Sequence, residues 1–248
     1  MNSEPNLSLT ESFERYFRVE LAVSEAQKRQ VFGIRYRVYC EEFKYEPTDH
    51  FPEQLEIDEY DQFSRHCLIV HRSTGTPAGC VRLVPALGEC DVDPLPLEKY
   101  CRTSLDWGYI ENLKLDRNTV CEISRLAVDG AFRRRTGESL TRFGQINGLT
   151  IDAQEQRSFS LIAVACFLAA TALTVMDGRT NVFAMMEPFL PRLMHRSGID
   201  FQRVGKDMDY HGIRAPYFIT SQSALNNMHS DLACLYQWIQ ESLKTNIP

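Results

Sequence analysis

The stretch that decides the fold is Thr119-Val120-Cys121-Glu122-Ile123-Ser124-Arg125-Leu126-Ala127-Val128-Asp129. It is rich in β-branched and apolar residues, which predicts a buried strand. Glu122 and Arg125 nevertheless lie inside it, and an isolated charge in an apolar interior is costly unless it is paired and hydrogen-bonded. The stretch therefore predicts either a polar functional site built into a sheet or a purely structural ion pair.

A second expected strand, Gly79-Cys80-Val81-Arg82-Leu83-Val84-Pro85, also carries a charge in its middle. Side chains alternate between the two faces of a regular strand, so an offset of three residues places Glu122 and Arg125 on opposite faces. Either only one of them faces the site, or the strand contains a β-bulge that re-aims a side chain. We take the charged groups of these two strands as the candidate functional centre.

The composition is typical of an ordinary globular chain with one large domain or two small ones: 248 residues, 44% hydrophobic, with a net charge of -6. The acidic balance argues against nucleic acid as the main partner, because phosphate binding needs a basic surface. The eight cysteines form no C-x-x-C pair, which makes a zinc or thioredoxin-like site a weak interpretation, and we expect no metal. No secretory signal pattern begins the sequence, so we expect a cytoplasmic protein.

One uncharged segment, residues 158–176, approaches the length of a membrane span. It contains serines, threonines and many alanines, and no aromatic belt flanks it. A helix buried against a sheet, apolar on nearly every side, also explains it. We favour the buried helix and expect no membrane span.

The remaining pattern predicts alternating strands, helices and loops. Residues 1–14 form a loose tail or a short helix. Further on, Ser24 and Gln27 form a capping box that starts a helix with an aromatic stripe along it. Further strands are expected at 15–23, 66–72, 78–86, 181–186, 201–204 and 215–220, and further helices near 97–101 and at 158–176, 187–196 and 223–245. This order suggests an α/β (α+β) fold: residues 15–248 as one domain with a mixed sheet and helices on its faces.

Two connections carry candidate binding residues. The acidic connection 46–64 contains Asp58 and Asp61 among apolar residues, and a connection of this length is typical of a binding loop or a disordered linker. The embedded apolar residues favour a docked loop. The basic turn Ala131-Phe132-Arg133-Arg134-Arg135-Thr136-Gly137-Glu138 is either a solvated loop or a site for the phosphates of a carrier-borne acyl group.

Four blocks of sequence, taken in order, resemble a known family. They are Ile34-Arg35-Tyr36-Arg37-Val38-Tyr39, Leu55-Glu56-Ile57-Asp58-Glu59-Tyr60-Asp61, Cys80-Val81-Arg82-Leu83-Val84-Pro85 and Glu122-Ile123-Ser124-Arg125. Together with the later Arg196-Ser197-Gly198, they resemble the autoinducer (acyl-homoserine-lactone) synthases. The sequence is more similar still to N-acyl amino acid synthases and, above all, to the acyltransferases associated with PEP-CTERM/exosortase systems.

The resemblance implies a GNAT-type acyltransferase fold, in which a bulged central strand splays from its neighbour and the acyl-pantetheine arm enters the slot. It implies Glu122 as the base, with Ser124 and Arg125 as further catalytic residues. It also implies a surrounding substrate-binding set: Arg35, Tyr39, Tyr45, Asp58, Asp61 and Arg82. Arg133, Arg134, Arg135 and Gly137 are the expected residues for the phosphopantetheine of the acyl carrier.

The expected reaction transfers a fatty acyl group from acyl-carrier protein or acyl-CoA to the amine of a small amino-acid-like acceptor. Arg35 and Arg82 are expected to bind the acceptor's carboxylate. We expect no tightly bound cofactor, with acyl-phosphopantetheine as co-substrate. S-adenosylmethionine is a less favoured co-substrate, because Tyr39 stands where the autoinducer synthases usually have Phe, and Tyr45 roughly where they have the Trp that packs against it.

Two other functions stay open at this point. An acetyl-CoA-dependent GNAT acetyltransferase would need a small acyl slot and a stronger phosphate loop than Arg134-Arg135-Thr136-Gly137-Glu138-Ser139. A non-catalytic acyl or amino-acid sensor would keep the pocket and bind a product without turnover.

Overall fold

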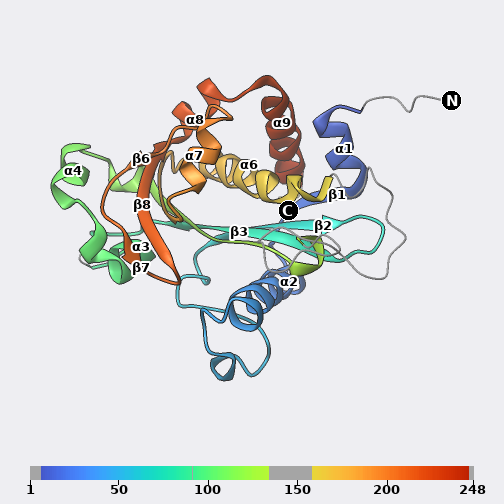
Figure 1. Ribbon diagram of the computed structural model, residues 1–248, viewed down its shortest axis with the longest axis horizontal. Coiled ribbons are helices and arrows are strands. Elements are labelled where there is room, and N and C mark those ends of the chain that lie inside the picture. The colour runs from blue at the N-terminus through green and yellow to red at the C-terminus, as the bar shows by residue number, and fades with distance from the viewer. Residues whose placement is uncertain (1–6, 91, 134–157, 246–248) are drawn as a thin grey trace.

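A twisted sheet runs through the middle of the molecule, with helices on both faces (Figure 1). The computed structural model describes residues 7–90, 92–133 and 158–245. Its strands are β1 (Phe17–Leu21), β2 (Arg65–His71), β3 (Pro77–Pro85), β4 (Val120–Val128), β5 (Asn181–Met186), β6 (Gln202–Arg203), β7 (Met208–Asp209) and β8 (Ile213–Thr220).

The strands follow the order β1-β2-β3-β4-β5-β8-β6, and β7 pairs with β8. Strands β4 and β5 run parallel, and the other described neighbours are antiparallel. This is the mixed α/β sheet that the sequence predicts.

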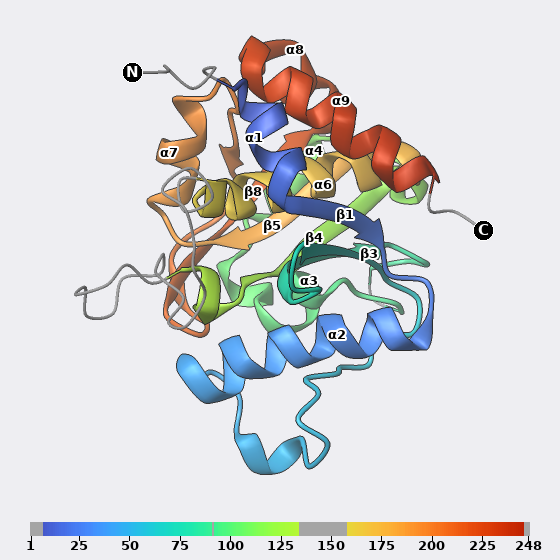
Figure 2. The same cartoon turned by 90° about the vertical axis from the view of Figure 1, so that its right-hand side faces the viewer.

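The helices lie in two layers on either side of this sheet. They are α1 (Leu9–Tyr16), α2 (Glu25–Arg35), α3 (Pro96–Tyr100), α4 (Trp107–Asn112), α6 (Leu161–Met176), α7 (Leu190–His195), α8 (Ser221–Asn227) and α9 (Ser230–Thr245). Figure 2 shows α2 on one side of the sheet, with α1, α6 and α9 on the other. The expected single helix at 223–245 is wrong, because Met228 adopts an extended conformation and separates α8 from α9.

Helix α6 is the uncharged segment that resembles a membrane span in sequence. Most of its side chains are buried, and it lies between the sheet and α9. Its close approach to the sheet is possible because β3 carries Gly79, where a Cβ atom would lie 2.8 Å from Ile162 Cγ2. In the part of the chain that the structure describes, no helix combines the length and the apolar character needed to cross a membrane.

The central strand β4 contains a β-bulge. On β3, Cys80 and Arg82 are two positions apart, whereas their partners Ala127 and Ser124 are three apart on β4. The extra residue leaves Arg125 with a φ of 52°, in the left-handed region that a bulky side chain rarely adopts. The bulge breaks the strict alternation that would place Glu122 and Arg125 on opposite faces.

Strands β4 and β5 separate immediately beyond Glu122. Their parallel pairing covers only Val120, Cys121 and Glu122 on β4. Beyond that point β4 continues its pairing with β3 to Val128, and β5 continues with β8 to Met186. The result is a slot between two well-supported strands, so the bulged and splayed central strand expected from the sequence is present.

Candidate active site

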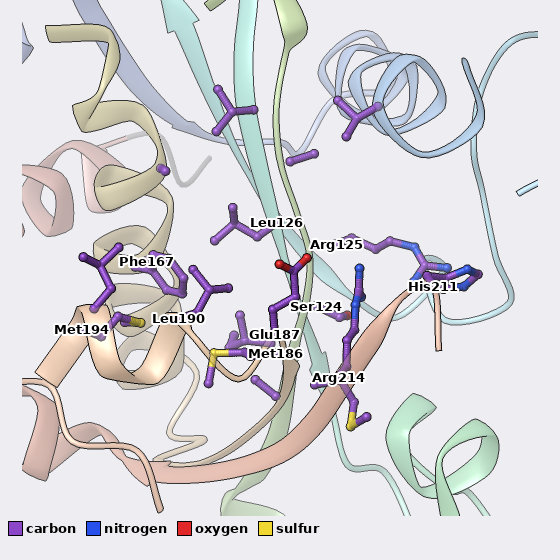
Figure 3. Close-up of a pocket in the computed structure, with 18 of the residues that line it drawn as sticks. Ser124, Arg125, Leu126, Phe167, Met186, Glu187, Leu190, Met194, His211 and Arg214 are labelled. Carbon is purple, nitrogen blue, oxygen red and sulfur yellow. The ribbon is translucent and has the colours of Figure 1, made fainter. Parts of the chain in front are cut away.

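A cavity of about 340 Å³ occupies the slot between β4 and β5. Residues 123–128 of β4 line one side and residues 184–187 line the other. Figure 3 shows apolar side chains, among them Phe167, Leu190 and Met194, at one end, and the polar Arg125, His211 and Arg214 at the other. The cavity therefore joins an apolar channel to a charged mouth.

A network of buried ion pairs supports the charged end. Its members are three arginines and three carboxylates: Arg35, Arg82, Arg125, Glu56, Asp58 and Asp61. Asp61 lies at the centre, because Arg35 binds both of its oxygens, at 2.6 and 3.0 Å, and Arg82 Nη1 donates to Oδ1 at 2.9 Å. The six formal charges cancel, which satisfies the requirement that buried charges be paired.

The other two carboxylates tie the bulged strand into the network. Glu56 accepts hydrogen bonds from Arg35 and, at 3.1 Å, from Nε of Arg125. Asp58 accepts from Arg82 at 2.6 Å and lies 3.3 Å from Nη2 of Arg125. Burial opposes ionisation of Glu56 and Asp61, but the charge of Arg35 and its neighbours outweighs burial and keeps the pKa of both carboxyls below the usual range. Glu56 and Asp61 are therefore ionised at neutral pH.

Arg35 is the last residue of helix α2 and reaches the network from the end of that helix. Ser24 and Gln27 form the expected capping box at its start. Past Arg35 the chain continues as a wide π-helical segment, η1 (Tyr36–Glu42), a form that is frequent at functional sites. From η1 the Tyr39 hydroxyl donates to the carbonyl of Leu126 at 2.9 Å, which ties the segment to the bulge.

Glu122 stands apart from the ionic network. Its side chain is 3% exposed and accepts a hydrogen bond from the amide of Leu97 at 2.7 Å, and within the described part of the chain it has no ion-pair partner. Burial raises the pKa of Glu122 to about 8, and outweighs the Leu97 hydrogen bond and the charges of Arg82 and Arg125. Glu122 lines the cavity and is largely protonated at neutral pH.

Four of the expected substrate-binding residues lie outside the cavity lining: Arg35, Asp58, Asp61 and Arg82. Arg35 and Arg82 are 0% and 1% exposed, and both guanidinium groups already bind Asp61. Their expected role as a direct clamp for the acceptor's carboxylate does not fit this geometry. Instead, they hold the carboxylates of the ionic network in place. Arg82 Nε also donates to Oγ of Ser124 at 3.2 Å.

The other expected residues divide between the cavity and the basic turn. Tyr39, Tyr45, Ser124 and Arg125 line the cavity. Arg133 also lines it, but its guanidinium is buried, donates to the carbonyl of Val128 at 2.6 Å and pairs with Glu42, so it does not offer itself to a phosphate. Arg134, Arg135 and Gly137 lie outside the described residues.

Several lining and supporting residues are missing from the sequence-based set: Glu46, Glu56, Leu97, Glu187, Tyr210, His211 and Arg214. Glu56 stands between the apolar Leu55 and Ile57, and its amide donates a hydrogen bond to the carbonyl of Phe32 on α2 at 3.1 Å. This tertiary contact is not visible in the sequence. Arg214 precedes an apolar strand that the sequence predicts to start at residue 215, whereas β8 begins at Ile213. A strand predicted to begin two residues earlier would have included Arg214.

Comparisons with known proteins point to the same fold as the separated strands β4 and β5. Residues 34–142 match the family model described as an acetyltransferase (GNAT) domain. Together the family match and the fold indicate an acyltransferase. None of the curated proteins matches the chain in sequence.

Three solved structures illustrate the fold. TofI, in a ternary complex with an inhibitor and MTA, has 17% identity and a TM-score of 0.60, over 89% of this chain and 99% of TofI. BjaI, a CoA-dependent acyl-homoserine lactone synthase with SAM and isopentyl-CoA, has 15% and 0.55, over 90% and 89%. FeeM, an N-acyl amino acid synthase from uncultured soil microbes, has 10% and 0.52, over 86% and 94%. These neighbours agree with the resemblance in the sequence.

The ionic network makes a prediction for stability. Asp61→Asn removes the central negative charge and leaves Arg35 and Arg82 undercompensated in the interior, so we expect a loss of about 3–5 kcal/mol in the free energy of unfolding at pH 7. Urea denaturation measures it. Because the pKa of Asp61 is lowered by folding, its contribution is complete above the unfolded value of about 4 and is lost as the pH falls further.

Glu53→Gln is the matched control, since Glu53 forms an exposed ion pair with Arg29 at 3.2 Å. We expect this change to alter the unfolding free energy by no more than about 0.5 kcal/mol. An Asp61→Asn protein as stable as the Glu53→Gln protein would show that the network is not needed for the fold.

Proposed function

We propose that the protein is an N-acyltransferase that moves a fatty acyl group from acyl-carrier protein or acyl-CoA to the amine of a small amino-acid-like acceptor. The product is an N-acyl amino acid or a related signal or lipid. The observation that carries the proposal is one continuous cavity in which the buried carboxyl of Glu122 meets an apolar channel.

The apolar end of the cavity suits a fatty acyl chain. Its lining comes from α6, α7 and β5, and includes Val164, Phe167, Met186, Leu190 and Met194. An acetyl group would fill only a small part of about 340 Å³, so the cavity favours a longer chain over acetyl transfer. BjaI was solved with an acyl-CoA, isopentyl-CoA, which supports an acyl-pantetheine donor for this fold.

The pKa of Glu122 suits a general base for an amine. An α-amino group titrates near ~8 and an unperturbed glutamate near ~4.3, so proton transfer to an ordinary carboxylate is uphill. Burial raises the pKa of Glu122 to about 8, so the pKa values of the amine and of the base are nearly equal. Ionised Glu122 takes the proton of the acceptor amine, directly or through one water.

The remaining steps use the slot itself. The amine nitrogen forms a bond to the thioester carbon, and the resulting oxyanion is stabilised by backbone N–H groups on the free edge of β4 beyond Glu122. The C–S bond then breaks, and the proton held by Glu122 passes to the departing thiolate. The amide and the free pantetheine thiol are the products, and the carboxylate is restored.

Tyr39 and Tyr45 shape the mouth of the cavity. Their rings lie 6.2 Å apart, and Tyr45 stacks on Phe43 at 5.4 Å. Structures of TofI and BjaI contain MTA and SAM respectively. Because the aromatic residues here differ from those of the autoinducer synthases, we propose an amino-acid-like acceptor in preference to S-adenosylmethionine.

Glu122→Gln tests the proposed base. Purified protein with decanoyl-carrier protein or decanoyl-CoA and a panel of amino acids should release thiol and form N-acyl products, and the variant should lower kcat by about 100-fold or more with the fold intact. With an acceptor whose amine is already neutral at pH 6, wild-type kcat/KM should rise with pH, reach half of its maximum near pH 8 and level off above that, because only ionised Glu122 accepts the proton.

The variant's profile should be flat over the same range. Near-normal activity of Glu122→Gln would remove Glu122 from the mechanism. Tight binding of N-acyl amino acids with no turnover of any donor would favour the sensor function.

The end of the apolar channel predicts a change in acyl-chain preference. Phe167 borders the main cavity and a second cavity of about 40 Å³, so Phe167→Ala joins the two. We expect the ratio of kcat/KM for longer over shorter acyl donors to rise by about 10-fold. Thr171→Ala is the control, since Thr171 lines only the second cavity and its loss leaves the wall intact. An unchanged preference in Phe167→Ala would place the acyl chain elsewhere.

A further inference from the structure

Among the residues that the structure describes, one arginine at the charged mouth of the cavity has no counter-ion. Of the described arginines that line the cavity, Arg125 pairs with Glu56 and Arg133 pairs with Glu42. Arg214, on β8, has neither a hydrogen-bond partner nor an ion-pair partner in the described part of the chain, and its Nε atom is buried. Its contact is with the ring of Tyr45, whose centroid lies 5.5 Å from the guanidinium carbon.

Within the described residues no carboxylate forms an ion pair with Arg214, although Glu46, Glu122 and Glu187 line the same cavity. His211 Nε2 lies 3.3 Å from a carboxylate oxygen of Glu46, so Glu46 is directed to His211. Burial, followed by the charge of Arg214, lowers the pKa of His211, which is therefore neutral at pH 7. A cation without a partner in a partly buried position is unfavourable, and an anion that enters the cavity would relieve that cost.

Arg214 lies within the same cavity as the proposed reaction centre. Figure 3 shows its side chain reaching toward Arg125, beside Ser124, and away from the apolar group of Phe167 and Met194. Arg214 and Glu122 both line this cavity, so their side chains face one enclosed region. The acceptor's amine must also reach this region in order to meet Glu122.

We propose that Arg214 binds the carboxylate of the acceptor, so that the enzyme selects amines that carry a carboxylate close to the nitrogen. This inference rests on the proposed acyltransferase function and names the residue that sets its acceptor class. A guanidinium group matches a carboxylate in a two-point hydrogen-bonded pair. The donor's phosphate is a less suitable occupant, because a whole pantetheine arm separates it from the reacting thioester.

The direct experiment compares each amino acid with its carboxamide as acceptor, for example leucine with leucinamide, using decanoyl-CoA as donor. We expect wild-type kcat/KM to be at least ~10-fold higher for the acid, the scale of a charge-assisted hydrogen bond. Arg214→Gln should remove this preference mainly by raising KM for the acid, while KM for decanoyl-CoA and kcat/KM for the carboxamide stay within about twofold. Arg214→Lys should restore part of the preference.

Arg203→Gln is the matched control. Arg203 lies on the neighbouring strand β6, is exposed and pairs with Asp207 at 2.8 Å, so its loss should leave the preference unchanged. Equal use of acid and carboxamide by the wild type, or a preference that survives in Arg214→Gln, overturns the inference. A rise in KM for decanoyl-CoA in place of the acid also overturns it and assigns Arg214 to the donor.

A binding measurement separates this inference from the proposed function. Calorimetry with N-decanoyl-leucine and N-decanoyl-leucinamide should show tighter binding of the acid by about 10-fold or more, lost in Arg214→Gln. If no donor and amine turn over but this selectivity is found, the acyltransferase function fails and the carboxylate site stands. If turnover is found without the selectivity, the carboxylate site fails and the function stands.

Discussion

The rest of the structure depends on the ion pairs that the carboxylate of Asp61 forms with Arg35 and Arg82. This carboxylate binds Arg35 at the end of α2 and Arg82 in the middle of β3, and so fixes a helix, a strand and the loop that carries it. Around it the three arginines and three carboxylates reach zero net charge inside the sheet layer. A neutral network of this kind places ionic groups beside an apolar slot at a tolerable cost, because each buried charge has a partner.

The same network explains why Glu122 behaves differently from the other acids. Glu56 and Asp58 take the guanidinium group of Arg125, which leaves Glu122 with the amide of Leu97 as its hydrogen-bond donor. Burial then raises the pKa of Glu122, whereas Asp61 stays ionised. Two classes of carboxyl group therefore coexist at the slot: one class holds the wall, and the other is suited to exchange a proton.

The sequence predicts most of the architecture, since hydrophobic pattern and capping are local properties. The strand Asn181–Met186 and the capping box at Ser24 lie where the pattern indicates. For the strand that carries Glu122 and Arg125, the sequence leaves two possibilities, a β-bulge or a single charge facing the site, and the structure contains the bulge. Which carboxylates join the ionic network and which one lines the slot depends on how α2 packs against the loop that carries Glu56, Asp58 and Asp61. The order of charges along the chain does not show this packing. Arg214 was missed because its importance comes from the absence of a counter-ion among the described residues, which appears only after folding.

A direct titration of Glu122 tests the central claim that this carboxyl is separate from the network. Carbon-13 NMR of the glutamate side chains, with the Glu122→Gln protein used to assign the signal, measures it. The structure predicts a carboxyl that titrates near 8, because it is buried with a single hydrogen-bond donor. A signal that titrates at or below the ordinary glutamate value of about 4.3 would show that Glu122 is solvated or ion-paired, and would contradict the account.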